Sequence, residues 1–183
     1  MSNTYQIPYQ WTCDVEADWG GRSDQFSTLQ NLVEIVQAFD KHGVKGLFFT
    51  NDICAQWVKY VCKDHELGSH GFTHTIYTNE VDARNNVMFR CDMGHYKYYR
   101  APKFSYIGDC VYSNPKNHLS ILKSMWFGIK PKPNTIMYLH PFDFYKWQGI
   151  MKPPSLFCRL WYSQPKRAWR HFENLLSKSS SYL

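Results

Sequence analysis

Short hydrophobic runs alternate with longer amphipathic stretches along the first part of the chain. Residues 7–14 and 44–50 are apolar runs of strand length, and residues 25–41 between them place leucine, valine and phenylalanine at helical spacing. We predict a second helix at 51–63 and a third, short strand at 65–69. Because strands and helices alternate in this order, the pattern indicates a parallel sheet with right-handed crossover connections.

The later part of the chain continues this alternation with a weaker signal. A helix is predicted at 78–92, and a fourth strand ends before Pro102, because proline cannot donate a backbone hydrogen bond to a neighbouring strand. No repeat or low-complexity linker divides the chain, so we predict one α/β domain over residues 1–183. The remaining predicted elements are strands at 96–101, 107–112 and 135–139 and helices at 117–126 and 165–178.

Composition places the chain among globular proteins. Hydrophobic residues make up 44% and charged residues 20% of it, and Lys and Arg are scattered apart from a group at 166–170. Despite the net charge of +6 we therefore predict no nucleic-acid partner. No apolar run approaches the roughly 18 residues that cross a bilayer, and no signal peptide is visible, so we predict no transmembrane segment and a cytoplasmic location. The six cysteines show no CxxC spacing and are expected to be reduced.

Two histidines four positions apart indicate a metal site. His70 and His74 follow a short apolar run, and on one helical turn or a tight loop their imidazoles point the same way. Upstream, Asp14 and Glu16 stand at alternate positions at the end of the first predicted strand, so they share one face. Two histidines and one carboxylate leave coordination positions open for water and substrate, which is typical of a catalytic metal site.

Five motifs along the chain occur in the order found in one known family. They are Thr12-Cys13-Asp14-Val15-Glu16, the segment 41–49, the segment 65–74, Tyr99-Arg100-Ala101-Pro102-Lys103-Phe104 and Tyr138-Leu139-His140-Pro141. In this register the chain resembles the polysaccharide deacetylases, the NodB-like metal-dependent carbohydrate esterases of family 4. The resemblance implies a distorted or incomplete (β/α) barrel with a divalent metal at the carboxyl ends of its strands.

The resemblance also implies the ligands of that metal. By similarity, His70, His74 and Glu16 hold zinc, with cobalt, nickel and manganese as alternatives. In relatives whose first motif is Asp-x-Asp or Asp-x-Glu, the second acid is the ligand. Because glutamate is one methylene longer than aspartate, the assignment with Asp14 as the ligand stays open.

The same comparison of motifs implies the catalytic groups. Asp14 takes the position of the general base, Arg100 that of the arginine that holds the base, and His140 that of the general acid. This agrees with elementary chemistry, since an arginine beside an aspartate keeps it ionised and an imidazole is suited to protonate a leaving amine. In the family an aspartate and a tryptophan tune this histidine, and Asp109 and Trp126 are the candidates in the short stretch before it.

Four further residues are predicted to contact the substrate. By resemblance, Leu139 lines a pocket for the acetyl methyl group. Backbone N–H groups near Phe104 to Tyr106 are expected to hold the oxyanion. Trp19 and Tyr106 are candidates for stacking on sugar rings in a chain with 17% aromatic residues.

The predicted function is hydrolysis of a non-peptide carbon–nitrogen bond. The chain is expected to remove the acetyl group from an N-acetylated amino sugar in a glycan, in peptidoglycan or in a precursor of a cell-surface polysaccharide. Two alternatives remain open, a degenerate member that binds glycan without turnover and a hydrolase of small cyclic amides or ureides. The sequence determines neither the metal, the sugar nor the oligomeric state.

Overall fold

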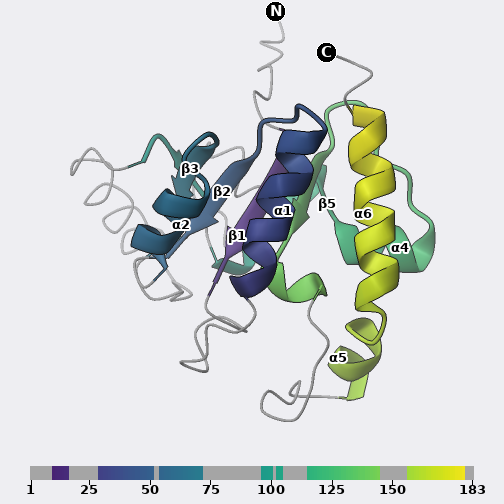
Figure 1. Cartoon of the computed structure of the whole chain (residues 1–183). Helices are drawn as coiled ribbons and strands as arrows, with labels where there is room; N and C mark the ends of the chain where they lie inside the picture. Colours follow the sequence, from purple (N-terminus) through teal and green to yellow (C-terminus); the bar gives the residue numbers. More distant parts are fainter. Residues whose placement is uncertain are drawn as a thin grey trace, which may run out of the picture.

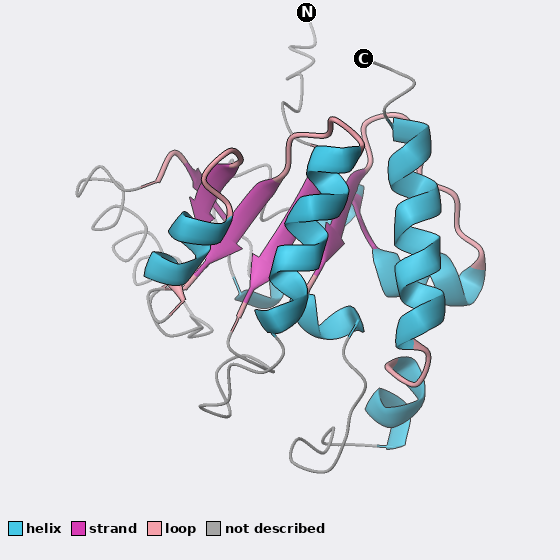
Figure 2. Ribbon diagram, in the orientation of Figure 1, coloured by secondary structure: helices cyan, strands magenta, loops and turns pink. Residues whose placement is uncertain are grey.

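In the part of the chain that the computed structural model describes, six parallel strands form a central sheet (Figures 1 and 2). The structure describes residues 10–16, 29–51, 54–71, 96–100, 102–104, 115–144 and 156–179. The strands are β1 (Trp11–Val15), β2 (Leu47–Thr50), β3 (Glu66–Ser69), β4 (Tyr98–Tyr99), β5 (His118–Ser120) and β6 (Ile136–Leu139). Their order is β4-β3-β2-β1-β6-β5, and every neighbouring pair runs parallel. The carboxyl ends of all six strands therefore lie at one edge, where polar side chains from different strands meet.

Helices cover one face of this sheet, with α1 and α6 side by side in front of it in Figure 1. Short turns of 3-10 type lie at η2 (Pro102–Phe104), η4 (Pro115–Asn117) and η5 (Pro141–Phe144). None of the helices within the described ranges is both long and apolar enough to cross a membrane. The helices are α1 (Gln30–Lys41), α2 (Ala55–Val61), α4 (Ile121–Phe127), α5 (Leu156–Trp161) and α6 (Pro165–Ser179).

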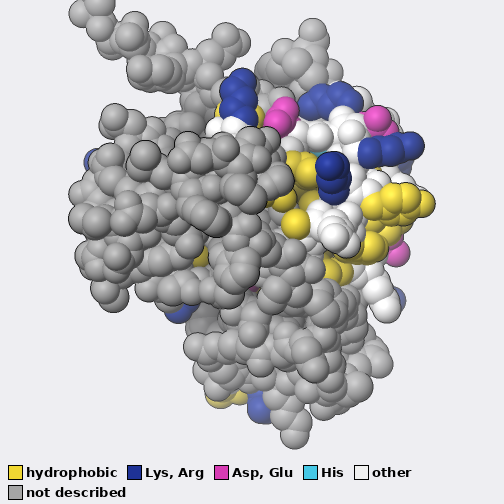
Figure 3. Space-filling view, turned by 90° about the vertical axis from the view of Figure 1, so that its left-hand side faces the viewer, with side chains coloured by type: hydrophobic (Ala, Val, Ile, Leu, Met, Phe, Trp, Pro, Cys, Tyr) yellow, Lys and Arg dark blue, Asp and Glu magenta, His cyan; other side chains and the backbone are white. Residues whose placement is uncertain are grey.

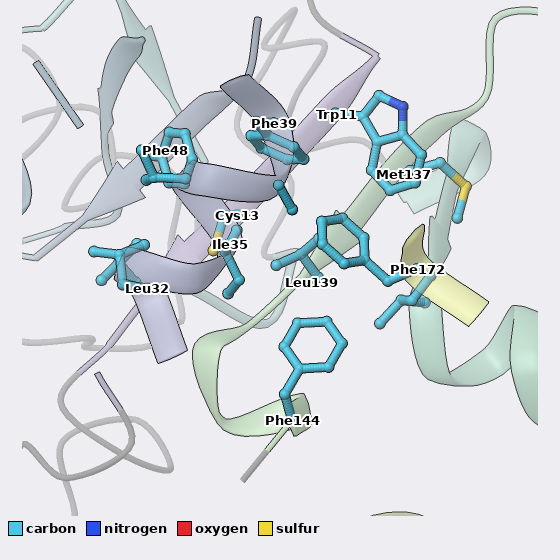
Figure 4. Close-up of a cluster of buried hydrophobic side chains, with 14 of the residues drawn as sticks. Trp11, Cys13, Leu32, Ile35, Phe39, Phe48, Met137, Leu139, Phe144 and Phe172 are labelled. Carbon is cyan, nitrogen blue, oxygen red and sulfur yellow. The ribbon is translucent and has the colours of Figure 1, made fainter. Parts of the chain in front are cut away.

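The larger hydrophobic core lies between the sheet and the helices. Trp11, Cys13 and Val15 point to this side from alternate positions of β1. The Trp11 ring lies 6.1 Å from that of Phe39 on α1 and 5.7 Å from that of Phe172 on α6 (Figure 4). Because all of these side chains are almost completely buried, the aromatic contacts fix the two helices against the central strand.

The opposite face of the sheet is more polar. Among the described residues its apolar cluster is small, with Leu47, Phe49 and Ile136 as its buried members. Thr12 and Asp14, the even-numbered residues of β1, are buried on this face. A (β/α) barrel would enclose this face as its interior, so the polar residues at its carboxyl edge are the ones to examine for chemistry.

Hydrogen bonds hold α6 in place at two points. The indole Nε1 of Trp11 donates to Ser179 Oγ at 3.0 Å. Ser124 Oγ on α4 donates to the carbonyl oxygen of Ile129 at 2.7 Å and lies 2.9 Å from His171 Nε2. Since the single hydroxyl proton of Ser124 is used by Ile129, His171 is the donor in the second bond. This serine–histidine pair therefore ties α4 to α6 and lacks the arrangement of a nucleophile and its base.

The predicted elements agree with the structure except in the second half of the chain. The α/β class is confirmed, and the strands within the described ranges form an open sheet, in agreement with an incomplete barrel. The helix predicted at 117–126 was placed too early, since 118–120 pair with β6 before the Ser120 hydroxyl caps α4. Helix α5 was not predicted. The helix at 78–92 and the strand at 107–112 lie outside the described residues.

Candidate active site

A buried ion pair joins the first and fourth strands at the carboxyl edge of the sheet. Arg100, directly after β4, donates from one guanidinium nitrogen to Asp14 Oδ1 at 2.6 Å and from the other to Thr12 Oγ1 at 2.7 Å. Thr12 in turn donates to the carbonyl oxygen of Met137 on β6 at 3.0 Å. Arg100 has no exposed surface and Asp14 has 3%. The side chains of β1 thus fix the guanidinium at two points, which determines its orientation.

Opposite charges keep the Asp14 carboxylate ionised although it is buried. Burial alone would raise its pKa, but the charges of Arg100, His70 and His140 outweigh that effect, so the pKa of Asp14 is lowered. Its second oxygen, Oδ2, lies 3.8 Å from Nε2 of His140. A carboxylate in this state is able to accept a proton at neutral pH.

Aromatic rings surround the guanidinium of Arg100. Its central carbon lies 4.4 Å from the ring centre of Phe49, 5.5 Å from that of Phe104 and 5.8 Å from that of Tyr138. Rings at these distances attract a cation and exclude water from it. The ion pair with Asp14 is therefore held in an environment of low dielectric constant, where its orientation is strongly favoured.

The turn after Arg100 is strained. Lys103 and Phe104 have φ angles of +53° and +54°, in the left-handed region that non-glycine residues rarely adopt. In this backbone conformation the Phe104 ring lies 5.1 Å from that of Tyr138 and 4.8 Å from that of His118. Two consecutive residues in this conformation persist only where the surroundings enforce it, which is common at functional sites.

His70 lies beside this pair, at the end of β3, and faces Glu16. Its Nδ1 lies 2.9 Å from the carbonyl oxygen of Arg100 and its Nε2 lies 3.1 Å from Glu16 Oε1. Nδ1 donates its proton to this carbonyl, and a proton on Nε2 is shared with Glu16. Loss of the Nε2 proton gives the tautomer that metal-binding histidines usually adopt. Burial would lower the pKa of His70, but Asp14 and Glu16 raise it.

The positions of His70 and Glu16 fit two ligands of one ion. Ligand atoms at about 2.1 Å from a tetrahedral zinc ion are roughly 3.4 Å apart, close to the 3.1 Å between Nε2 and Oε1. Within the described ranges no three His, Cys, Asp or Glu side chains gather closely enough to hold an ion. His74, the predicted third ligand, lies outside those ranges.

A second acid holds His140, which follows β6. Asp143 Oδ2 accepts a hydrogen bond from the backbone N–H of His140 at 2.8 Å and lies 3.6 Å from its Nδ1. The imidazole stacks on Phe142 with ring centres 4.4 Å apart and planes 16° apart. Burial would lower the pKa of His140, but Asp143 and Asp14 raise it to about 9. His140 is therefore positioned and protonated at neutral pH.

Sequence reasoning missed Asp143 and Thr12. Asp143 is three residues after His140, and this i, i+3 spacing in a turn was the signal that could have revealed it. Of the two residues predicted to tune His140, Asp109 lies outside the described residues. The side chain of Trp126 is directed toward α5, where its Nε1 donates to the carbonyl oxygen of Trp161 at 2.9 Å.

The predicted substrate contacts are only partly described. The side chain of Leu139 is completely buried in the core on the helix side of the sheet (Figure 4), on the face opposite to Asp14 and Arg100. Tyr138 is the residue of β6 that shares a face with His140, and their ring centres are 5.9 Å apart. Phe104 contacts the Arg100 guanidinium, whereas Trp19 and Tyr106 lie outside the described ranges.

Gly68 makes room for the ring that covers Arg100. A Cβ atom at this position would lie 2.6 Å from the Phe49 ring and 3.1 Å from the carbonyl oxygen of Tyr98. We expect Gly68→Ala to lower the free energy of unfolding by about 1–3 kcal/mol, because a packed ring and a backbone cannot both move away. Urea denaturation measures the change.

Phe49→Leu provides the matched test of this explanation. If the clash with the ring is the cause, Gly68→Ala costs less in the Phe49→Leu background than in the unchanged chain. Equal costs in both backgrounds would contradict it.

Comparisons with known proteins find similar structures and no similar sequences. No protein-family model matches the chain, and the search of curated proteins found no match. Wild-type BA3943, a CE4 family pseudoenzyme from Bacillus anthracis, matches with TM-score 0.45 and 14% identity over 92% of this chain. A BA3943 mutant with restored enzymatic activity matches with TM-score 0.47 and 16% identity, also over 92%. The Bc1960 peptidoglycan N-acetylglucosamine deacetylase matches with TM-score 0.49 and 13% identity over 93%.

The chain is shorter than the proteins it matches. It spans 65% of the length of the BA3943 mutant, 63% of wild-type BA3943 and 82% of Bc1960. Their descriptions give BA3943 as a CE4 family pseudoenzyme and Bc1960 as a peptidoglycan N-acetylglucosamine deacetylase.

Proposed function

We propose that this chain is a metal-dependent N-deacetylase of the polysaccharide deacetylase type. Its reaction is hydrolysis of the acetamide of an N-acetylated amino sugar in a glycan, in peptidoglycan or in a polysaccharide precursor. One observation carries the proposal. The Asp14 carboxylate lies between a buried arginine and a protonated histidine, beside a histidine and a glutamate whose ligand atoms are 3.1 Å apart.

Glu16, His70 and His74 are the residues proposed to hold the metal. Glu16 and His70 are supported by the separation of their ligand atoms and by the carbonyl oxygen of Arg100, which orients the imidazole. A bound divalent ion supplies an acidified water and a polarised substrate carbonyl. Zinc is the preferred candidate because two nitrogens and one oxygen with an open position are typical of catalytic zinc sites. Cobalt, nickel and manganese remain alternatives.

Asp14 is proposed as the general base and His140 as the general acid. Asp14 accepts a proton from the attacking water, and Arg100 keeps the carboxylate ionised and oriented until then. The water oxygen bonds to the acetyl carbon, and the bond from that carbon to nitrogen breaks. His140 donates its proton to the leaving nitrogen, so the products are acetate and a free amine. The buried ion pair supports Asp14 as base and Glu16 as ligand over the reverse assignment.

Acetate release is the experiment that tests the proposal. Purified protein is loaded with zinc and incubated with N-acetylglucosamine oligomers, and both acetate and free amine are measured. We expect equal amounts of the two products, loss of both with a chelator, and recovery on adding metal back. The His70→Ala variant is expected to lose the activity and at least tenfold in zinc affinity, because a ligand is removed.

Three outcomes would contradict the proposal. Full activity in the chelated protein or in His70→Ala would exclude the metal role. Binding of the oligomers without acetate release by metal-loaded protein would favour the non-catalytic glycan-binding alternative. Ring opening of a cyclic amide or ureide without acetate release from any oligomer would favour the other alternative. Glu34→Gln, at an exposed position on α1, is the matched control and is expected to change nothing.

Asp143 is proposed to position His140 and keep it protonated. In Asp143→Asn the imidazole loses its nearest negative charge, so its pKa falls from about 9 toward the usual value. Activity needs the protonated form and is lost as pH rises through this pKa. We expect the alkaline limb of the pH–kcat/KM profile to move to lower pH in the variant. An unshifted limb would exclude Asp143 from this role.

A further inference from the structure

The second half of the described chain is strongly basic on its surface. Two acids occur there, Asp143, which is buried in the site, and Glu173, which is half-buried and lies 3.8 Å from Lys41 of α1. The basic side chains are all exposed. They are Lys116, Lys123, Lys130, Lys132, Arg159, Lys166, Arg167, Arg170 and Lys178.

Exposed hydrophobic side chains gather in the same region, where α4 ends against α5. Leu156 and Leu160 are 72% and 60% exposed, and Phe127 and Ile129 are 66% and 40% exposed. The ring of Phe127 lies 6.0 Å from that of Trp161, so α4 and α5 bring the hydrophobic residues together. Monomeric proteins rarely expose so many large apolar side chains in one place without an interaction.

Basic and hydrophobic side chains lie together on the exposed faces of α4 and α5. Leu156 and Leu160 are four positions apart on α5 and share a face, with the exposed Arg159 beside them. Lys123 and Phe127 have the same spacing on α4. We refer to the exposed side chains at 123, 127, 129, 130, 156, 159 and 160 as the basic apolar surface. Figure 1 shows α5 at the lower end of α6 and α4 partly behind α6.

We propose that the basic apolar surface docks on a lipid bilayer that contains anionic headgroups. The hydrophobic side chains enter the boundary between headgroups and acyl chains, and the lysine and arginine side chains meet the negative headgroups. A second copy of the chain fits less well, because it would set positive charge against positive charge. Nucleic acid provides phosphates but no apolar layer for two leucines.

Another face of the molecule differs in its charges. Figure 3 views the left-hand side of Figure 1, and its described part shows hydrophobic side chains beside Lys and Arg, with Asp and Glu among them. Helix α2 offers a matched pair for comparison, the exposed Lys59 and the 81% exposed Tyr60. Asp and Glu side chains on the same face weaken its attraction to an anionic surface, so Lys59 and Tyr60 serve as the control.

Sedimentation with vesicles tests the proposal. The protein is mixed with vesicles of phosphatidylcholine alone and with vesicles that contain about 30% phosphatidylglycerol, at low and at high salt. We expect binding to the anionic vesicles only, with a strong decrease at about 0.5 M salt, where charges are screened. Lys130→Gln/Arg159→Gln is expected to weaken binding about fivefold per charge removed. Leu156→Ser/Leu160→Ser is expected to weaken it about tenfold or more.

The controls separate docking from misfolding and from other partners. Each variant is checked for an unchanged melting temperature, and Lys59→Gln/Tyr60→Ser must bind vesicles as the unchanged chain does. No binding to anionic vesicles, equal binding to neutral vesicles, or an equal loss in the α2 control would overturn the proposal. Binding to single-stranded RNA without vesicle binding would overturn it as well, as would a dimer in solution broken by Leu156→Ser/Leu160→Ser. The test does not depend on deacetylase activity.

Discussion

Replacing Asp14 with asparagine is expected to lower kcat/KM for acetate release by about two to four orders of magnitude. Asparagine keeps the size of the side chain and an oxygen toward Arg100, but it cannot accept the proton of the attacking water. The pKa of Asp14 is lowered, so the carboxylate is ionised throughout the working range and the loss should be similar at pH 6 and pH 8. Acetate release by metal-loaded protein measures it.

Stability and metal content must be compared alongside this change. Asp14 is buried against Arg100, so Asp14→Asn also weakens folding, and its activity is measured at a temperature where the variant is shown to be folded. Its zinc content should stay near that of the unchanged chain if Glu16 and not Asp14 is the ligand. Activity within tenfold of the unchanged chain in a folded, metal-loaded variant would exclude Asp14 as the general base. Loss of the zinc together with the activity would instead make Asp14 a ligand.

Replacing Arg100 with leucine is expected to lower the free energy of unfolding by about 3–5 kcal/mol at pH 7. Leucine leaves the buried Asp14 carboxylate without its strongest partner and the Thr12 hydroxyl without a donor. In the unchanged chain the pKa of Asp14 is lowered, so its ion pair contributes stability that is present at neutral pH and is lost as pH falls. Arg100→Leu removes the largest cause of that lowering, so the deficit should shrink as pH is lowered. Urea denaturation at several pH values measures this.

The double variant Arg100→Leu/Asp14→Asn isolates the ion pair. Asparagine removes the unpaired charge, so the double variant should be more stable at pH 7 than Arg100→Leu alone. Free energies that add independently, or a deficit that does not depend on pH, would mean that Arg100 stabilises the fold through its packing on Phe49 and not through Asp14.

Local patterns in the sequence were sufficient for most of the sheet. The predicted strands at 7–14 and 44–50 contain β1 and β2, in which four or five consecutive residues are all buried, as expected for a parallel sheet that is covered on both faces. The prediction was wrong for the short, partly polar strand β5. Residues 118–120 read as the start of a helix, but pairing with β6 turned them into a strand, since a backbone hydrogen bond to a neighbour outweighs a weak local preference.

The sequence by itself determined which residues meet at the carboxyl edge, since each lies near or just after the carboxyl end of a strand of one parallel sheet. These residues are Asp14, Glu16, His70, Arg100 and His140. Their contacts depended on tertiary structure. Neighbouring residues of β6 point to opposite faces of the sheet, so Leu139 lies in the helix-side core and Tyr138 lies toward His140. The turn at η5 brings Asp143 back to His140, and β1 brings Thr12 to Arg100. Local preferences set the strands, whereas partners distant in sequence, or placed by a turn, are set by three-dimensional packing.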